Sequence, residues 1–390
     1  MHAKVIREGI HWMGAVDWDR RWFDALVPTP QGTSYNAWLV EGTQKTVLLD
    51  TVDDSMAGDL MAQLADVPRV DFVVAHHAEQ DHSGALPKVL ERYPEAIVLC
   101  TSKAVGYLQD LLPLSAARLR AVGDNETLDL GGRTLQFLHL PWVHWPETMA
   151  TYLVEDRVLF SCDLFGAHLA SAGLFASRDE ILEPAKRYYA EIMMPFRALV
   201  SKHIERLASL PIDVICPSHG PAHDDTLFIR SAWQQWAAGA PVSKVVVPYV
   251  SMHGSTRRMV DHLVGALSAR GVPAEPLNLL VNDLGAVAMA LVDPATVVFA
   301  TPVVLNGLHP LVQSAAFVAG ALKPKTRFAA TISSYSWGGK IDEQVKALLG
   351  GLKAEFLPPV TCKGAPKDAD FAALDALAET IVAKHREAGL

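Results

Sequence analysis

Residues 76–84 limit the possible fold and function of this chain more than any other stretch does. They read HHAEQDHSG and follow residues 70–75, a run of β-branched and aromatic side chains that predicts a buried strand. Three imidazoles and two carboxylates therefore lie within seven residues, at the point where a strand gives way to a loop. Nitrogen and oxygen donors at this density favour a metal site over a solvated polar loop.

Three later strand ends also carry metal-compatible side chains. They are His144, Asp163 and His219, after the predicted strands 134–140, 157–161 and 212–216. One His or Asp beyond a strand is more often a turn or capping residue. Together with residues 76–84, however, four strand ends deliver such groups, and this pattern favours one shared metal site.

The first half of the chain alternates strands with short helices before it turns to hairpins. The predicted strands are 33–40, 45–50 and 96–100, the helices are 55–64 and 85–92, and the hairpins begin near residue 124. This order predicts sheets covered by helices.

A domain boundary is predicted near residue 240, where a helix ends and Gly239-Ala240-Pro241 follows. We therefore expect domains 1–240 and 241–390. In the second, strands at 244–250, 275–280, 295–300, 327–332 and 355–357 alternate with helices at 256–270, 284–291, 311–322, 340–349 and 368–386. Such alternation predicts a doubly wound parallel sheet, whose ligands bind beyond the carboxyl ends of the strands.

Three loops are predicted at that edge of the second sheet. Residues 251–256 (SMHGST) place hydroxyls and N–H groups at a helix start, which suits an anion, although such residues often serve only as a cap. Residues 301–307 (TPVVLNG) and 333–339 (SSYSWGG) also lie at strand ends, and the small side chains with Tyr335 and Trp337 in the second of them suit a flat ring. The alternative for Trp337 is a side chain packed on its own loop.

The charge and composition of the chain limit the classes of partner that it can bind. The chain has 34 basic and 43 acidic residues and a net charge of −9, which argues against nucleic acid or an anionic membrane as the main partner. The first residues carry charges where a signal peptide needs an apolar core. The longest stretch without charged residues, 294–322, is interrupted by prolines and cannot form one spanning helix. We expect a cytoplasmic protein.

The ligand order resembles the metallo-β-lactamase fold, an αββα sandwich with a two-metal site at its edge. Most hydrolases of that fold have His where this chain has Glu79, and a hard oxygen donor shifts preference from zinc towards iron or manganese. Glu79, residues 81–84 (DHSG) and residues 143–148 (VHWPET) are similar to flavodiiron proteins, and the three later loops resemble the FMN loops of short-chain flavodoxins. The whole chain resembles an A-type flavodiiron protein, an α/β architecture in which the sandwich precedes a flavodoxin-like sheet of five parallel strands.

The resemblance implies two irons and one FMN. His77, Glu79 and His144 would bind one iron, Asp81, His82 and His219 the other, with Asp163 bridging, and whether His82 binds is left open. The residues implied for FMN are Ser251, Met252, His253, Gly254, Ser255, Thr256, Thr301, Pro302, Asn306, Gly307, Ser334, Tyr335, Ser336, Trp337 and Gly338.

The resemblance also implies reduction of dioxygen to water or of nitric oxide to nitrous oxide, with the choice of gas left open. Electrons would come from a separate donor, such as rubredoxin or a reductase, and the chain would form a head-to-tail homodimer or a tetramer. Either Tyr188 or Tyr189 would lie behind the metal ligands. The rival hypotheses are a zinc hydrolase fused to a flavin module and a non-catalytic electron carrier with a degenerate metal site.

Overall fold

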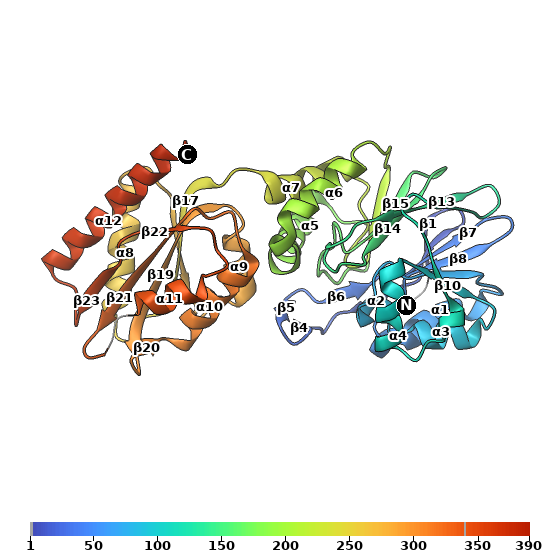
Figure 1. Ribbon diagram of the computed structural model, residues 1–390, viewed down its shortest axis with the longest axis horizontal. Helices are drawn as coiled ribbons and strands as arrows, with labels where there is room; N and C mark the ends of the chain where they lie inside the picture. The colour runs from blue at the N-terminus through green and yellow to red at the C-terminus, as the bar shows by residue number, and fades with distance from the viewer. Residues whose placement is uncertain (1–2, 339–340) are drawn as a thin grey trace. The chain divides into compact units, whose positions relative to one another are not determined.

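A computed structural model describes residues 3–338 and 341–390, and the chain divides into two compact units (Figure 1). The first comprises Met1–Tyr189 and Phe196–Ala238, and the second comprises Ala190–Pro195 and Gly239–Leu390. The boundary expected at residue 240 stays a prediction, because these units are defined by contacts and not by independent folding. Gly339 and Lys340, which were expected in a loop and at a helix start, lie outside the described residues.

The first unit contains two mixed sheets. The order β1-β2-β7-β8-β9-β10-β11 builds one, and β12-β13-β14-β15-β16 builds the other. The strands of the first are β1 (Lys4–Arg7), β2 (Ile10–Trp12), β7 (Trp38–Glu41), β8 (Thr46–Leu49), β9 (Phe72–Val74), β10 (Ile97–Cys100) and β11 (Leu119–Ala121). Those of the second are β12 (Thr127–Asp129), β13 (Thr134–His139), β14 (Met149–Leu153), β15 (Val158–Cys162) and β16 (Val214–Pro217).

Alternation along β8 places the first sheet between two apolar layers. Val47 and Leu49 join a core that contains Phe137 and Phe160 of the second sheet. The intervening Leu48 points to the opposite face, into a core built with helices α1, α3 and α4. The helices of this unit are α1 (Ala57–Gln63), α2 (Gln80–Ser83), α3 (Leu86–Arg92), α4 (Ser102–Leu111), α5 (Arg178–Tyr188), α6 (Arg197–Leu207) and α7 (Thr226–Ala238).

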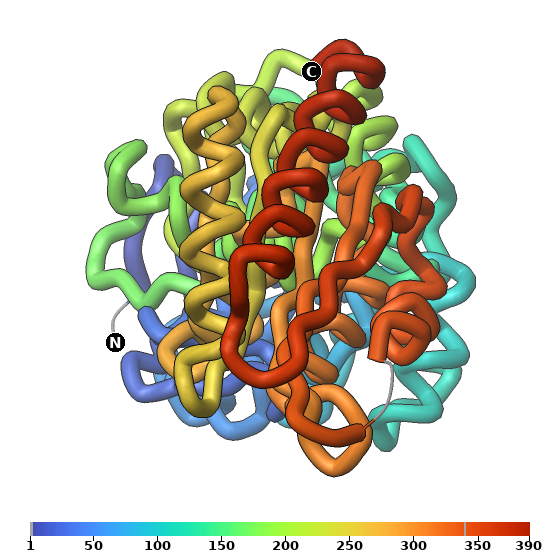
Figure 2. The backbone as a smooth tube through the Cα atoms, turned by 90° about the vertical axis from the view of Figure 1, so that its left-hand side faces the viewer, coloured from blue at the N-terminus to red at the C-terminus, as the bar shows by residue number. Residues whose placement is uncertain are grey.

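The second unit is a doubly wound parallel sheet in the order β18-β17-β19-β21-β22. Its strands are β17 (Val242–Tyr249), β18 (Ala274–Asn278), β19 (Pro294–Val304), β20 (Gly307–Leu308), β21 (Phe328–Tyr335), β22 (Glu355–Phe356) and β23 (Val360–Lys363). Figure 2 shows α12 (Asp368–Glu387) beside α8 (Ser255–Ser268), and both contribute to the core on one face. The opposite face is covered by α9 (Leu284–Ala290), α10 (Pro310–Leu322) and α11 (Asp342–Leu348). The predicted α/β fold class is confirmed for both parts of the chain.

Two loops expected in the second unit are partly strand. β19 continues to Val304, where Leu305 and Asn306 form a hairpin turn with positive φ angles of 49° and 61°. β21 likewise continues to Tyr335. The β-branched run that ends at Val304 explains the first extension, because it suits a pleated strand better than a loop.

The strand β23 was not predicted. It pairs with β21 in parallel, after β22 has paired with the earlier part of the same strand. Pro358 and Pro359 separate the two short strands, since proline cannot donate to the ladder. Among the described residues, every helix is too short or too polar to cross a bilayer.

Candidate metal centre

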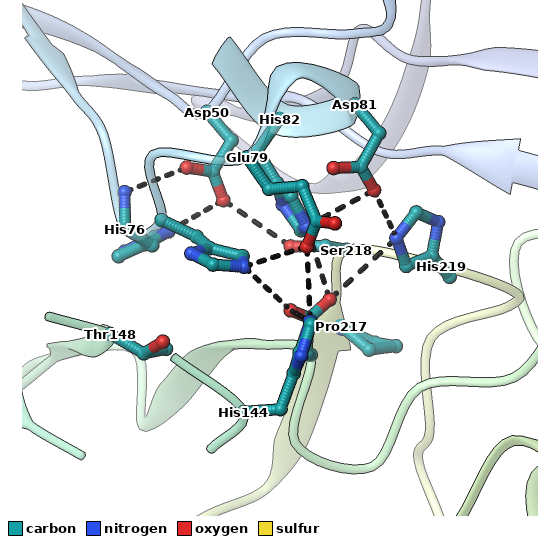
Figure 3. A network of polar contacts seen from close by, with 12 residues as sticks. Asp50, His76, Glu79, Asp81, His82, His144, Thr148, Pro217, Ser218 and His219 are labelled. Carbon is teal, nitrogen blue, oxygen red and sulfur yellow. Dashed lines mark hydrogen bonds and ion pairs between the residues drawn. The ribbon is translucent and has the colours of Figure 1, made fainter. Parts of the chain in front are cut away.

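All seven predicted metal ligands meet at one edge of the first unit. His77 and Glu79 follow β9, Asp81 and His82 belong to α2, His144 lies between β13 and β14, and Asp163 and His219 follow β15 and β16. β15 and β16 are parallel, so their carboxyl ends deliver Asp163 and His219 to the same place. Figure 3 shows Glu79, Asp81, His82, His144 and His219 pointing towards one another.

The first cluster consists of His77, Glu79 and His144. Glu79 Oε2 lies 3.0 Å from His77 Nε2 and 3.1 Å from His144 Nε2. Two atoms that bind one ion at about 2.1 Å each lie roughly 3 to 3.5 Å apart. The spacing of this cluster therefore suits a single metal ion.

The second cluster consists of Asp81, His82 and His219. Asp81 Oδ2 lies 3.2 Å from His82 Nε2 and 2.9 Å from His219 Nε2. His82, whose participation was left open, thus points into the cluster. All three side chains are buried.

Asp163 lies between the two clusters. Its Oδ2 is 3.8 Å from His77 Nε2 and 3.6 Å from His144 Nε2, whereas its Oδ1 is 3.2 Å from His82 Nε2 and 3.6 Å from His219 Nε2. Each oxygen of this one carboxylate therefore faces a different cluster. This is the arrangement expected of a carboxylate that bridges two metal ions.

Neighbouring acceptors fix the tautomers of two histidines. His77 Nδ1 lies 2.7 Å from Glu147 Oε1, and His219 Nδ1 lies 2.7 Å from the Ser34 carbonyl oxygen. Because a carboxylate and a carbonyl can only accept, each Nδ1 carries the proton. Both Nε2 lone pairs are left for a metal ion.

The carboxylates and imidazoles of the two clusters strongly shift one another's pKa values. Burial alone would lower the pKa of His77, but hydrogen bonds to Glu147 and Glu79 outweigh it and raise the pKa to about 9. Burial would raise the pKa of Asp163, but the charges of His82 and His77 hold it well below the usual range. Protonated histidines thus balance buried carboxylates, a role that metal ions can take over.

Two buried oxygens support a metal site directly. Within the described residues, Asp81 Oδ1 and Asp163 Oδ2 have no hydrogen-bond partner. An unpaired buried carboxylate oxygen is costly, whereas a bound cation would satisfy it. The mixture of imidazoles and hard carboxylates suits iron or manganese better than a thiolate-preferring metal.

The structure distinguishes the two candidate tyrosines. The Tyr188 hydroxyl donates to Asp163 Oδ1 at 2.9 Å, whereas the Tyr189 hydroxyl donates to the Trp236 carbonyl at 3.1 Å. Burial, and next the charge of Asp163, raise the pKa of Tyr188 well above its usual value. Tyr188 is therefore a protonated donor to the carboxylate between the clusters.

Sequence reasoning missed several contacts of the ligands. Glu147 was noticed only as part of residues 143–148, and the Ser34 contact uses a main-chain oxygen that no sequence pattern identifies. Asp24, in the turn between β4 (Trp22–Phe23) and β5 (Val27–Pro28), hydrogen-bonds Glu79. Burial, together with the charges of Glu79 and Asp81, raises the Asp24 pKa to about 6.

An apolar cleft of about 560 Å³ opens beside the first cluster. His144 forms part of its wall, with Trp142, Trp145 and Phe196 among the aromatic neighbours. The cleft offers a route to the metal position for a small, uncharged molecule, because its lining holds few groups that would retain water.

In the second unit, a cleft of about 400 Å³ lies beyond the carboxyl ends of β17, β19 and β21. Ten predicted FMN residues line it, namely Ser251, Met252, His253, Ser255, Thr256, Pro302, Ser334, Tyr335, Ser336 and Trp337. Val303, Val304 and Leu305, which belong to the predicted loop 301–307, also line it, as does Gly364, which was not predicted.

Five predicted FMN residues support the cleft without lining it. Gly254 caps α8 with a φ of 88°, and Thr301 is buried within β19. Asn306 and Gly307 belong to the hairpin turn. Gly338 packs against that turn, where an added Cβ would come within 2.9 Å of Asn306 Oδ1.

Comparison with known proteins agrees with this geometry. Residues 33–220 match the family described as ODP family beta lactamase. The chain is 33% identical over 392 residues to a protein described as nitric oxide reductase from Moorella thermoacetica, covering 97% of this chain and 98% of that protein.

Solved structures extend the similarity over the whole chain. Rubredoxin oxygen:oxidoreductase from Desulfovibrio gigas has a TM-score of 0.94 and 29% identity, covering 99% of both chains. A flavodiiron protein from Giardia intestinalis has a TM-score of 0.90 and 27% identity, covering 98% of both chains.

Proposed function

Because the chain belongs to the flavodiiron protein family and is an oxidoreductase of that family, we propose that it reduces dioxygen to water, nitric oxide to nitrous oxide, or both. The site would consist of two irons, and FMN would supply the electrons. One observation carries the proposal: the two oxygens of Asp163 face two clusters that have the spacing of separate metal positions.

The first and second clusters would each hold one iron, and Asp163 would bridge them. A bound iron pair supplies redox equivalents and open coordination positions to a small ligand. Tyr188 orients the bridge through its hydrogen bond to Asp163. Glu79 distinguishes this site from a zinc hydrolase, because it supplies a hard oxygen donor where a nitrogen is usual.

The aromatic cleft beside His144 supports a gaseous substrate. Dioxygen and nitric oxide are small and uncharged, so they lose little hydration on entering an apolar passage. A polar ester or lactam would find few hydrogen-bonding partners there.

The cleft of the second unit would hold FMN. The start of α8 would hold the phosphate, because main-chain N–H groups and the helix dipole favour an anion there. Thr256 Oγ1 lies 2.9 Å from Ser334 Oγ, which joins the start of α8 to the end of β21. Tyr335 and Trp337 would border the flavin ring.

A separate donor, such as rubredoxin or a reductase, would deliver electrons to the flavin, since the D. gigas relative is described as a rubredoxin oxygen:oxidoreductase. A head-to-tail homodimer, alone or within a tetramer, would bring the FMN of one chain to the iron pair of another.

Anaerobic stopped-flow of the FMN- and iron-loaded protein tests the function. After reduction, the flavin should reoxidise rapidly with dioxygen, with nitric oxide, or with both, and yield water or nitrous oxide. Protein grown with iron should contain two irons per chain. Two zinc ions with ester or lactam hydrolysis, or reoxidation by neither gas, would contradict the proposal.

A further inference from the structure

We propose that Glu147 is a positioning residue whose carboxylate strengthens the binding of a divalent metal at the first cluster and leaves the second cluster unaffected. The inference rests on the proposed function, because it concerns the same metal pair. It assigns Glu147 to one of two positions that contain similar donors.

Glu147 is rigidly placed behind His77. Its Oε1 lies 2.7 Å from His77 Nδ1 and accepts a further hydrogen bond from the Ala78 N–H at 3.0 Å. The Thr101 hydroxyl donates to the Glu147 carbonyl at 2.9 Å and holds the main chain of this segment. The side chains of Glu147 and His77 are both 0% exposed, so water does not screen the interaction.

In the second cluster His219 has no such carboxylate, whereas its other histidine, His82, has the buried Asp50 carboxylate within 4.8 Å. His219 Nδ1 donates to the main-chain oxygen of Ser34, which is a neutral acceptor. Hydrogen bonds to ionised acceptors are roughly twice as strong as neutral ones, and a carboxylate makes the imidazole it holds more basic. His77 should therefore donate more strongly to a metal than His219 does.

This contact predicts that metal affinity at the first cluster depends on Glu147, because the carboxylate fixes the orientation of His77 and makes its imidazole more basic. Loss of an outer-shell partner of this kind typically costs about 10–100-fold in metal affinity. Glu147→Gln keeps an oxygen that can accept from His77 but removes the charge, and thus isolates the electrostatic part of the effect.

The experiment is a Co²⁺ titration of the metal-free, FMN-loaded full chain, followed by visible absorption. The wild-type chain should bind two Co²⁺, one at each cluster. His219→Ala leaves the first cluster intact, and His144→Ala leaves the second. Glu147→Gln should weaken Co²⁺ binding about 10–100-fold in the His219→Ala background and less than twofold in the His144→Ala background.

Two further variants separate charge from position. Glu147→Asp keeps the charge and should bind more tightly than Glu147→Gln in the His219→Ala background. Thr101→Val removes a hydrogen bond to the same main-chain segment but leaves the carboxylate, and should preserve the binding of both Co²⁺. Circular dichroism and flavin absorption show whether each variant is folded.

Equal losses in the two single-cluster backgrounds, or no loss in either, would overturn the inference while leaving the proposed function intact. A loss in Thr101→Val as large as that in Glu147→Gln would also overturn it. A folded wild-type chain that binds fewer than two Co²⁺ would count against both the inference and the proposed function.

Discussion

His223 should make the stability of the first unit fall in mild acid. This residue is buried, its Nε2–H donates to the Phe165 carbonyl at 2.9 Å, and its main chain pairs with Ile215 of β16. Burial lowers its pKa from 6.5 to about 4. Because Phe165 belongs to the turn after Asp163, a charge on His223 would lie beside the segment that carries this carboxylate.

The sign and size of the effect follow from the pKa difference. Above pH 6.5 His223 is neutral in both states, whereas below it the unfolded chain binds a proton that the folded chain does not. Each pH unit in this window costs about 1.4 kcal/mol. Stability should therefore fall by about 2 kcal/mol between pH 6.5 and 5, and by about 3 kcal/mol by pH 4.

Guanidinium unfolding, followed by tryptophan fluorescence at several pH values, measures this dependence. His223→Gln supplies an amide N–H to Phe165 and does not titrate, so its curve should lack the contribution of His223. Other buried histidines remain in both proteins, and their contributions cancel in the difference between wild type and variant. A variant with the same pH dependence as wild type would refute the reasoning.

Three other substitutions test the two sites. Glu79→Ala should lose metal from the first cluster and lose gas reduction while keeping flavin absorption; full turnover would refute its role as a ligand. Tyr188→Phe should lower iron retention or turnover, because it removes the hydrogen bond to Asp163. Tyr189→Phe is the control, since Tyr189 is also buried but donates to a main-chain carbonyl, and it should have no such effect. Equal effects of the two variants would refute the assignment of Tyr188. Trp337→Ala should raise the FMN Kd roughly 2- to 12-fold, because stacking on the flavin ring is lost. The control is Phe317→Ala, which removes an exposed aromatic side chain on α10. Unchanged FMN affinity in Trp337→Ala would contradict the stacking role.

The fold and the cluster of ligands could be predicted because strand ends are visible in sequence. Buried apolar runs mark the strands, and His77, Asp163 and His219 follow them directly. The parallel pairing of β15 with β16 then brings distant residues together. The length of β19 was predicted less well, because residues 301–307 were assigned to a loop although the strand continues to Val304.

The surroundings of the ligands could not be predicted, for physical reasons. The contact of His219 with Ser34 uses a main-chain oxygen, which every residue has. Tyr188 and Tyr189 are neighbours with the same side chain, and only the rotation of α5 decides which of them reaches Asp163. Asp24 meets Glu79 through a turn between two short strands that have no clear periodicity.

The parallel pairing of β15 and β16 has a consequence for how this chain can vary. Asp163 and His219 are each anchored within two residues of a strand that is held by its neighbour, so the connection between them does not itself fix their separation. Within that connection, Tyr188 donates a hydrogen bond to Asp163, and the Ala167 N–H donates one to the His219 carbonyl. Insertions or exchanges between α6 and β16 could therefore reshape the outer surface of the first unit, while the relative positions of Asp163 and His219 stay unchanged.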